Sequence, residues 1–74
     1  MTVNELIEQL KNYPSDMRVL TLGYEGGYND IQLKTEEIVF DFSKELGWYY
    51  GPHECVRFTG LSLGEKCLII GRGK

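Results

Sequence analysis

The spacing of apolar residues at the start of the chain predicts a helix. Four of them recur at the i, i+3, i+4 and i+7 spacing that places side chains on one helical face: Val3, Leu6, Ile7 and Leu10. Thr2 and Glu5 form a capping-box pattern, in which each side chain accepts a hydrogen bond from the backbone amide of the other residue. Pro14 disfavours the helical conformation of the residue before it, so we expect the helix to end near Asn12.

Four later segments carry apolar patterns that are typical of β-strands. They are MRVLTLGY (17–24), EEIVFDF (36–42), ECVRFTG (54–60) and KCLIIGR (66–72). The second and third alternate apolar and polar residues, as half-buried strands do, and the fourth is a continuous apolar run, as in an interior strand. The segment GLSLGE between the last two ends in Gly64-Glu65, which predicts a hairpin turn that joins them.

One helix followed by four strands predicts an α+β fold in a single domain over residues 1–74. We expect the N-terminal helix to pack on one face of a four-stranded, mostly antiparallel sheet. A chain of this length buries only about 60–65% of the surface that its unfolded form exposes, and such small scaffolds usually need a disulfide, a metal or a partner subunit. Because one helix cannot cover both faces of the sheet, the pattern predicts a homo-oligomer.

Charge and hydropathy exclude several classes of partner. The chain has 11 acidic residues and 8 lysines and arginines, a net charge of −3, so it lacks the positive surface with which proteins grip duplex nucleic acid. Residues 1–45 hold nine acids and four bases, whereas residues 46–74 hold two acids and four bases. The second part is therefore basic enough to hold a small anion. The chain has no long apolar run and no basic-then-apolar start, which predicts a cytoplasmic protein without a signal peptide or a membrane span.

The residues that most often carry chemistry are sparse. His53, Cys55 and Cys67 offer at most three zinc ligands, without the closely paired spacing of zinc sites. His53 and Cys55 are the one possible catalytic dyad. We interpret them as a packing pair, because a histidine beside a cysteine at the edge of a strand is more often a packing pair than a catalytic one. The cysteines are interpreted as buried thiols. The sequence therefore predicts a non-enzymatic protein with no catalytic residues, no metal and no cofactor.

The segment LGYEGGYNDI, residues 22–31, is the first candidate binding segment. Its glycines, Gly26 and Gly27 above all, permit positive φ and leave backbone amides uncovered, a geometry that can hold an anion. Tyrosine rings beside them are flat stacking surfaces, and the Asn-Asp pair that follows can bind a base edge or a ribose. A plain turn is the alternative interpretation. We expect the whole connection to run from Gly23 to about Glu36, which is longer than a hairpin needs.

A second candidate is the loop SKELGWYYGPH, residues 43–53, in which Trp48, Tyr49 and Tyr50 are consecutive. Three consecutive rings cannot all point inward from a short segment, so we interpret them as an exposed contact surface. The alternative is that one or two of them cover the small core. Arg57 and Arg72, on strands that we expect to face each other, can supply cations for a phosphate; ordinary solvated arginines are the alternative.

The segments TVNELIEQL, YPSDMRVL and GYEGGYNDI resemble a set of short proteins of bacteriophages and other mobile elements. These proteins open with V-x-E-L-I, continue with P-x-D-x-x-V and carry a G-Y-E-G-G-Y-like turn. The resemblance covers the first 31 residues, and LIIGRGK is similar to their closing strand. It implies a small phage-borne α+β protein located in the host cytoplasm, with no known activity to transfer.

The resemblance also implies a function by analogy. Other phage proteins of this size act as oligomeric sponges for nucleotide signals of bacterial immunity, an anti-defence role. We therefore expect a binding protein for a small anionic nucleotide. Its expected ligand-binding residues are Tyr24, Gly26, Gly27, Tyr28, Asn29, Asp30, Trp48, Arg57 and Arg72. The alternative function is a protein-binding module that docks on a host protein through the loop aromatics.

Overall fold

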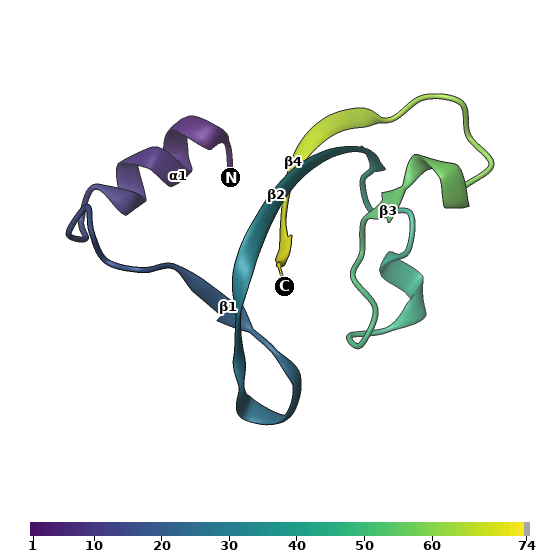
Figure 1. Ribbon diagram of the computed structural model, residues 1–74. Coiled ribbons are helices and arrows are strands. Elements are labelled where there is room, and N and C mark those ends of the chain that lie inside the picture. The colour runs from purple at the N-terminus through teal and green to yellow at the C-terminus, as the bar shows by residue number, and fades with distance from the viewer. Residues whose placement is uncertain (74) are drawn as a thin grey trace. The chain divides into compact units, whose positions relative to one another are not determined.

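The structure is a computed structural model that describes residues 1–73. Within these residues the fold is α+β, with an N-terminal helix and a four-stranded, mostly antiparallel sheet, as the sequence predicts (Figure 1). The elements are α1 (Val3–Leu10), β1 (Leu20–Leu22), β2 (Tyr28–Val39), β3 (Glu54–Cys55) and β4 (Glu65–Arg72). Three 3-10 helices, η1 (Tyr24–Gly26), η2 (Lys44–Leu46) and η3 (Val56–Phe58), lie between the strands.

The capping box at the start of α1 is confirmed. The Thr2 hydroxyl accepts a hydrogen bond from the Glu5 amide at 3.1 Å, and the Thr2 amide donates to the Glu5 carboxylate at 3.2 Å. The amide hydrogen bond from Thr2 lowers the pKa of Glu5, because it favours the charged carboxylate. The helix ends at Leu10, and amides of the next turn close onto carbonyls of its last residues, as the Asn12 amide does onto Gln9.

β2 is the strand with which each of the others pairs. β1 pairs with its first residues, Leu20 opposite Asp30, and β3 pairs with its last residues, Val39 opposite Glu54. β4 also pairs with β2. The residue after β4, Gly73, donates its amide to the Asp30 carbonyl near the start of β2 at 2.6 Å. Figure 1 shows β4 running in the opposite direction to β2.

The prediction of a long connection between Gly23 and about Glu36, after β1, is wrong. β2 begins at Tyr28 and has 12 residues, so the connection is the five residues Gly23–Gly27 and is of ordinary hairpin length. The first part of β2 is rich in polar residues and has a weak apolar alternation, which is why sequence patterns missed it. Its strand conformation depends on hydrogen bonding to neighbouring strands.

The prediction of a strand over residues 54–60 is also wrong beyond Cys55. β3 covers Glu54–Cys55 only, and the chain continues into η3. The Thr59 hydroxyl donates to the Val56 carbonyl at 2.7 Å and accepts from the Leu61 amide at 3.1 Å, and such local hydrogen bonds compete with strand pairing. Arg57 therefore lies in a 3-10 helix and does not face Arg72 from a neighbouring strand. The expected hairpin at Gly64-Glu65 is absent as well, since β3 and β4 each pair with β2.

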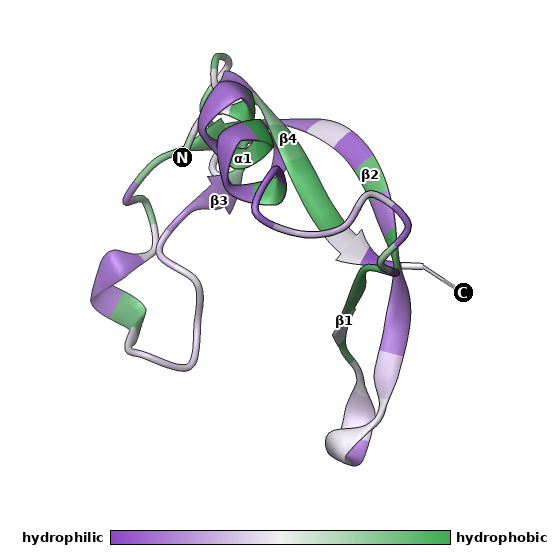
Figure 2. Cartoon of the chain, turned by 90° about the vertical axis from the view of Figure 1, so that its left-hand side faces the viewer, coloured by the Kyte–Doolittle hydropathy of each residue, from purple (hydrophilic) through white to green (hydrophobic). Residues whose placement is uncertain are grey.

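The chain divides into two units. Among the described residues, unit 1 comprises 1–32 and 70–73, and unit 2 comprises 33–69. Among residues 1–73 no hydrophobic residue is fully buried, and Ser43 is the one buried residue, with 3% of its surface exposed. α1 has no fully buried residue, and its apolar residues Val3, Ile7 and Leu10 are 45–55% exposed. Figure 2 shows α1 with both polar and apolar residues and β4 as mostly apolar.

Within residues 1–73, no helix has the length and hydropathy needed to cross a lipid bilayer.

Candidate functional site

The aromatic loop, defined as residues 43–54 of unit 2, presents its tryptophan to solvent. The segment leaves β2, forms η2, passes Trp48, Tyr49 and Tyr50, and enters β3. The Trp48 side chain is 96% exposed, whereas Tyr50 is 44% exposed. The exposure of Trp48 agrees with the interpretation of these rings as an exposed surface. It does not agree with the alternative that Trp48 covers the core.

Glu54 anchors the loop where it enters β3. One oxygen of its carboxylate, Oε2, accepts hydrogen bonds from the Tyr50 hydroxyl at 2.7 Å and from the Ser43 hydroxyl at 3.1 Å. The other, Oε1, accepts from the Cys55 amide at 3.3 Å. The Ser43 amide donates to the Pro52 carbonyl at 2.9 Å, which joins the two ends of the loop. Because β3 pairs with β2 at Glu54, the carboxylate holds the loop to the sheet.

These hydrogen bonds change the acidity of both partners. The Tyr50 hydroxyl is the largest cause of a lowered pKa at Glu54, because a donated hydrogen bond favours the ionised carboxylate, and Ser43 and the Cys55 amide add to it. The same hydrogen bond is the largest cause of a raised pKa at Tyr50, because it favours the protonated hydroxyl. The anchor is therefore strongest with an ionised Glu54 and a neutral Tyr50.

Gly47 gives the loop its local shape. Its φ of 118° and ψ of 171° lie in a region that is essentially restricted to glycine. A Cβ at this position would also lie 2.9 Å from Cε1 of Tyr49, so the ring occupies space that another residue would need. The rings of Trp48 and Tyr49 meet edge to face at 6.0 Å between centroids. The result is a pair of packed aromatic rings on a hydrogen-bonded loop, a surface suited to burial by a partner.

The glycine-rich turn of unit 1 is a closed hairpin turn. The Gly23 amide donates to the Gly27 carbonyl at 2.8 Å, and the Gly27 amide donates to the Tyr24 carbonyl at 2.9 Å. Gly26 has φ 82°, and Glu25 has φ 49°. Since the Gly27 amide is already satisfied, it does not offer the uncovered donor that the sequence suggested for a phosphate.

The side chains around this turn contact other parts of unit 1. The Arg72 guanidinium lies 4.6 Å from the centroid of the Tyr24 ring, a cation–π arrangement. The Asn29 amide group donates to the Gly73 carbonyl at 3.5 Å. Asp30 lies 3.9 Å from the guanidinium of Arg18. Sequence reasoning missed the role of Gly23, where a Cβ would collide with the Asn29 side-chain oxygen.

The predicted site residues fall into two groups. Unit 1 contains seven of them: Tyr24, Gly26, Gly27, Tyr28, Asn29, Asp30 and Arg72. Unit 2 contains Trp48 and Arg57, and the Arg57 guanidinium lies 5.1 Å from the centroid of the Phe58 ring. Sequence reasoning missed Ser43 and Glu54, because neither belongs to a motif and their hydrogen bond joins residues 11 positions apart.

His53 and Cys55 make separate contacts. His53 accepts a hydrogen bond from the Asp41 amide at Nδ1, at 3.0 Å, and its ring lies edge-on to Phe40 at 4.7 Å between centroids. The half-buried Cys55 thiol donates to the Glu36 carboxylate at 3.5 Å. In the described part of the chain, no three His, Cys, Asp or Glu residues are grouped so as to hold a metal ion.

In comparisons with known proteins, no family model, no curated protein and no solved structure matches this chain.

Proposed function

We propose that this protein is a non-enzymatic protein-binding module that docks on another protein through the aromatic loop. The observation that carries the proposal is the exposed Trp48 side chain on a loop that Glu54 anchors. Tryptophan and tyrosine dominate the few residues that supply most of the binding energy at protein interfaces. A surface that is already ordered before binding loses less conformational entropy when its partner arrives.

The size of the Trp48 ring makes it an effective anchor. An aromatic side chain buries about 150–250 Å², which at about 25 cal/mol per Å² corresponds to roughly 4–6 kcal/mol before the costs of association. The indole N–H adds one donor that can orient the partner. The resemblance of the first 31 residues to short phage proteins makes a protein of the bacterial host the partner class that we propose.

The test uses the single tryptophan of the chain as its own probe. Tagged wild-type protein, a Trp48→Ala variant and a Phe58→Ala variant are used to capture proteins from bacterial extract. Phe58 is the matched control, because it is an exposed aromatic residue of unit 2 outside the aromatic loop. A true partner is captured by the wild type and by Phe58→Ala, and is lost with Trp48→Ala.

The captured protein is then purified and titrated into the wild type. We expect the Trp48 emission to shift to shorter wavelength and to become protected from iodide, because the indole leaves water. Equal capture by the wild type and by Trp48→Ala, or an unchanged emission spectrum at saturation, contradicts the proposal.

A second candidate function is sequestration of a small anionic nucleotide, the anti-defence sponge, at the turn of unit 1. The observation that favours it is the Arg72 guanidinium over the Tyr24 ring, since arginine and an aromatic face together suit a phosphate and a base. The satisfied Gly27 amide and the nearby carboxylate of Asp30 weigh against it. Titration calorimetry against cyclic and ADP-ribose nucleotides tests it: binding heat that Arg72→Ala abolishes supports it, and no heat across the panel refutes it.

A further inference from the structure

The chain's single histidine joins the two segments that lead into and out of the aromatic loop. β2 and β3 pair as far as Val39 opposite Glu54, and the next step of the same register places Phe40 opposite His53. The rings of Phe40 and His53 meet edge to face at 4.7 Å between centroids. The Asp41 amide donates to Nδ1 of His53 at 3.0 Å. Phe40, Asp41 and His53, which we call the loop base, all belong to unit 2.

Asp41 has a backbone conformation that needs support. Its φ of 58° is left-handed, and a residue other than glycine keeps this conformation only where its surroundings stabilise it. Asp41 belongs to the turn over residues 40–43, with which the chain leaves β2. Its carbonyl accepts from the Lys44 amide at 3.5 Å, which is a longer contact than the 3.0 Å hydrogen bond to His53. The His53 ring is therefore the closest polar support of this left-handed residue.

The hydrogen bond to Nδ1 depends on the charge of the ring. A backbone amide can only donate, so Nδ1 must present a lone pair, and the neutral ring carries its one proton on Nε2. When a proton from water adds to Nδ1, both ring nitrogens become donors, and the Asp41 N–H then faces another N–H. The charged ring cannot accept this hydrogen bond. Histidine is the side chain whose charge ordinarily changes between about pH 5 and 8.

The charged groups around His53 provide an acceptor for the new proton. Oδ1 of Asp41 lies 4.0 Å from Nδ1, so a small rotation brings it within hydrogen-bond distance. Among residues 1–73, no lysine or arginine lies within 4.0 Å of the Asp41 carboxylate, although Lys44 is close in sequence. The Glu54 carboxylate, on β3, is occupied by the hydrogen bonds that anchor the aromatic loop. The carboxylate of Asp41 is thus the one free to pair with a protonated ring.

We infer that His53 is a proton-operated switch at the base of the aromatic loop. The neutral ring accepts the Asp41 amide and holds the left-handed turn, whereas the protonated ring donates to the Asp41 carboxylate and releases the amide. The Glu54 anchor stays in place over the same range, because the hydrogen bond from Tyr50 lowers the pKa of that carboxylate. Acidification therefore loosens the loop base while the Tyr50–Glu54 hydrogen bond remains.

Nuclear magnetic resonance of the full chain tests the inference, and the single histidine makes the ring signals unambiguous. At about pH 8 the nitrogen-15 spectrum should show Nε2 with a proton and Nδ1 without one. As the pH falls to about 5, Nδ1 should gain its proton. The Asp41 amide proton should move upfield with the same midpoint, because it loses its hydrogen bond, and the Asp41 Cα signal should change as φ leaves the left-handed region.

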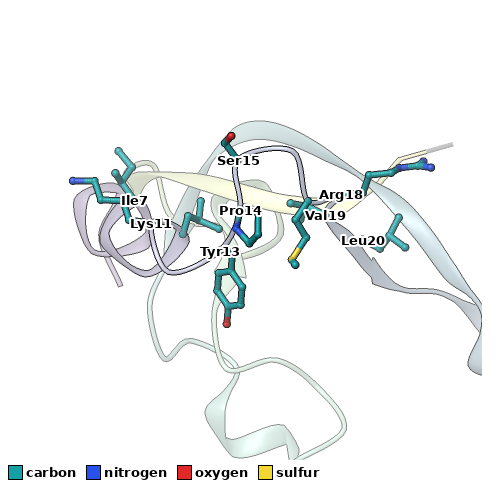
Figure 3. A pocket seen from close by; sticks show the side chains of 10 residues that line it. Ile7, Lys11, Tyr13, Pro14, Ser15, Arg18, Val19 and Leu20 are labelled. Atoms are coloured by element: carbon teal, nitrogen blue, oxygen red, sulfur yellow. The ribbon is translucent and has the colours of Figure 1, made fainter.

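Two sets of amides serve as internal controls. The Cys55 amide donates to the Glu54 carboxylate, so it should move only near pH 4 or below, where carboxylates gain protons. The apolar groove of unit 1 is lined by residues from the segment 7–20, which contains no histidine (Figure 3). In this segment the Tyr13 and Met17 amides donate to backbone carbonyls, and neither amide should follow the midpoint of the His53 ring.

His53→Phe is the variant that removes the switch. It keeps an aromatic ring beside Phe40 and removes both the lone pair and the titration of the imidazole. Its Asp41 amide should stay at the upfield position of the acidic wild type throughout the range. The wild-type titration decides the question by itself if this variant does not fold. A neutral ring with its proton on Nδ1, or an Asp41 amide that does not move while His53 titrates, overturns the inference.

The inference does not rest on the proposed docking function, because each measured signal belongs to the free protein. An Asp41 amide that follows the His53 ring supports the switch even if no partner protein is captured, and that outcome refutes only the docking function. A partner captured through Trp48, together with an Asp41 amide that does not respond to pH, refutes only the switch.

Discussion

Replacing Gly47 by alanine tests whether the aromatic loop is held in one conformation. The φ of 118° at Gly47 costs a non-glycine residue about 1–3 kcal/mol. The added Cβ would also lie 2.9 Å from the Tyr49 ring, which has to move by several tenths of an ångström. We expect a total cost of about 2–3 kcal/mol for keeping the native loop, since both effects act at the same residue.

The same loop supplies a matched control at Gly51. A Cβ there has no heavy atom within 4 Å, and the backbone does not have a positive φ. Gly51→Ala should therefore be neutral, or stabilising by about 0.4–1 kcal/mol through the lower entropy of the unfolded chain. The two variants carry the same chemical change four residues apart, on either side of the aromatic rings.

Thermal unfolding and the fluorescence anisotropy of Trp48 measure the outcome. If the loop unfolds together with the rest of the chain, Gly47→Ala should lower Tm by roughly 10–20 °C at equal protein concentration. If the loop opens by itself, Tm changes little and the Trp48 anisotropy falls, because the indole gains motion. A Gly47→Ala variant with both the Tm and the anisotropy of Gly51→Ala would refute the ordered loop, and with it the preorganised anchor.

Four further variants test the remaining local interactions. Thr2→Ala removes the capping box and should cost about 1 kcal/mol, seen as a loss of helical circular dichroism. In the unit 1 turn, Gly26→Ala should cost about 1–2 kcal/mol in urea unfolding because of its positive φ. Gly27→Ala, at φ −78°, should cost less, because its Cβ meets only the Tyr24 carbonyl oxygen, at 3.3 Å; equal losses would contradict the turn geometry. The lowered pKa of Glu54 contributes stability that is present above the pKa of the unfolded chain and is lost as pH falls through the folded-state pKa. In Glu54→Gln, the free energy of unfolding should no longer fall in this way at acid pH. The raised pKa of Tyr50 gives the wild type a separate loss of stability, which occurs as pH rises through the folded-state pKa of Tyr50.

The helix and the class of the fold were predictable from the sequence because their interactions are local. The Thr2–Glu5 capping box joins residues three positions apart, so a short motif contains both partners. The continuous apolar run of β4 identifies that strand in the same way. The solvent exposure of Trp48 was also predictable, because three consecutive aromatic residues cannot all be buried by one small segment.

The tertiary structure decided the features whose partners lie far apart in the chain. The polar first half of β2 is a strand because β1 and β4 pair with it. The apolar residues among residues 28–35 have no periodicity that predicts a strand. β3 ends at Cys55, before the turn that the Thr59 hydroxyl stabilises, and Arg57 therefore lies in η3 instead of the predicted strand. The anchor of the aromatic loop likewise depends on Glu54 reaching Ser43, and only the folded chain brings the two together. Apolar spacing and short motifs report interactions within a few residues, whereas strand pairing and side-chain hydrogen bonds over longer separations exist only after the chain has folded.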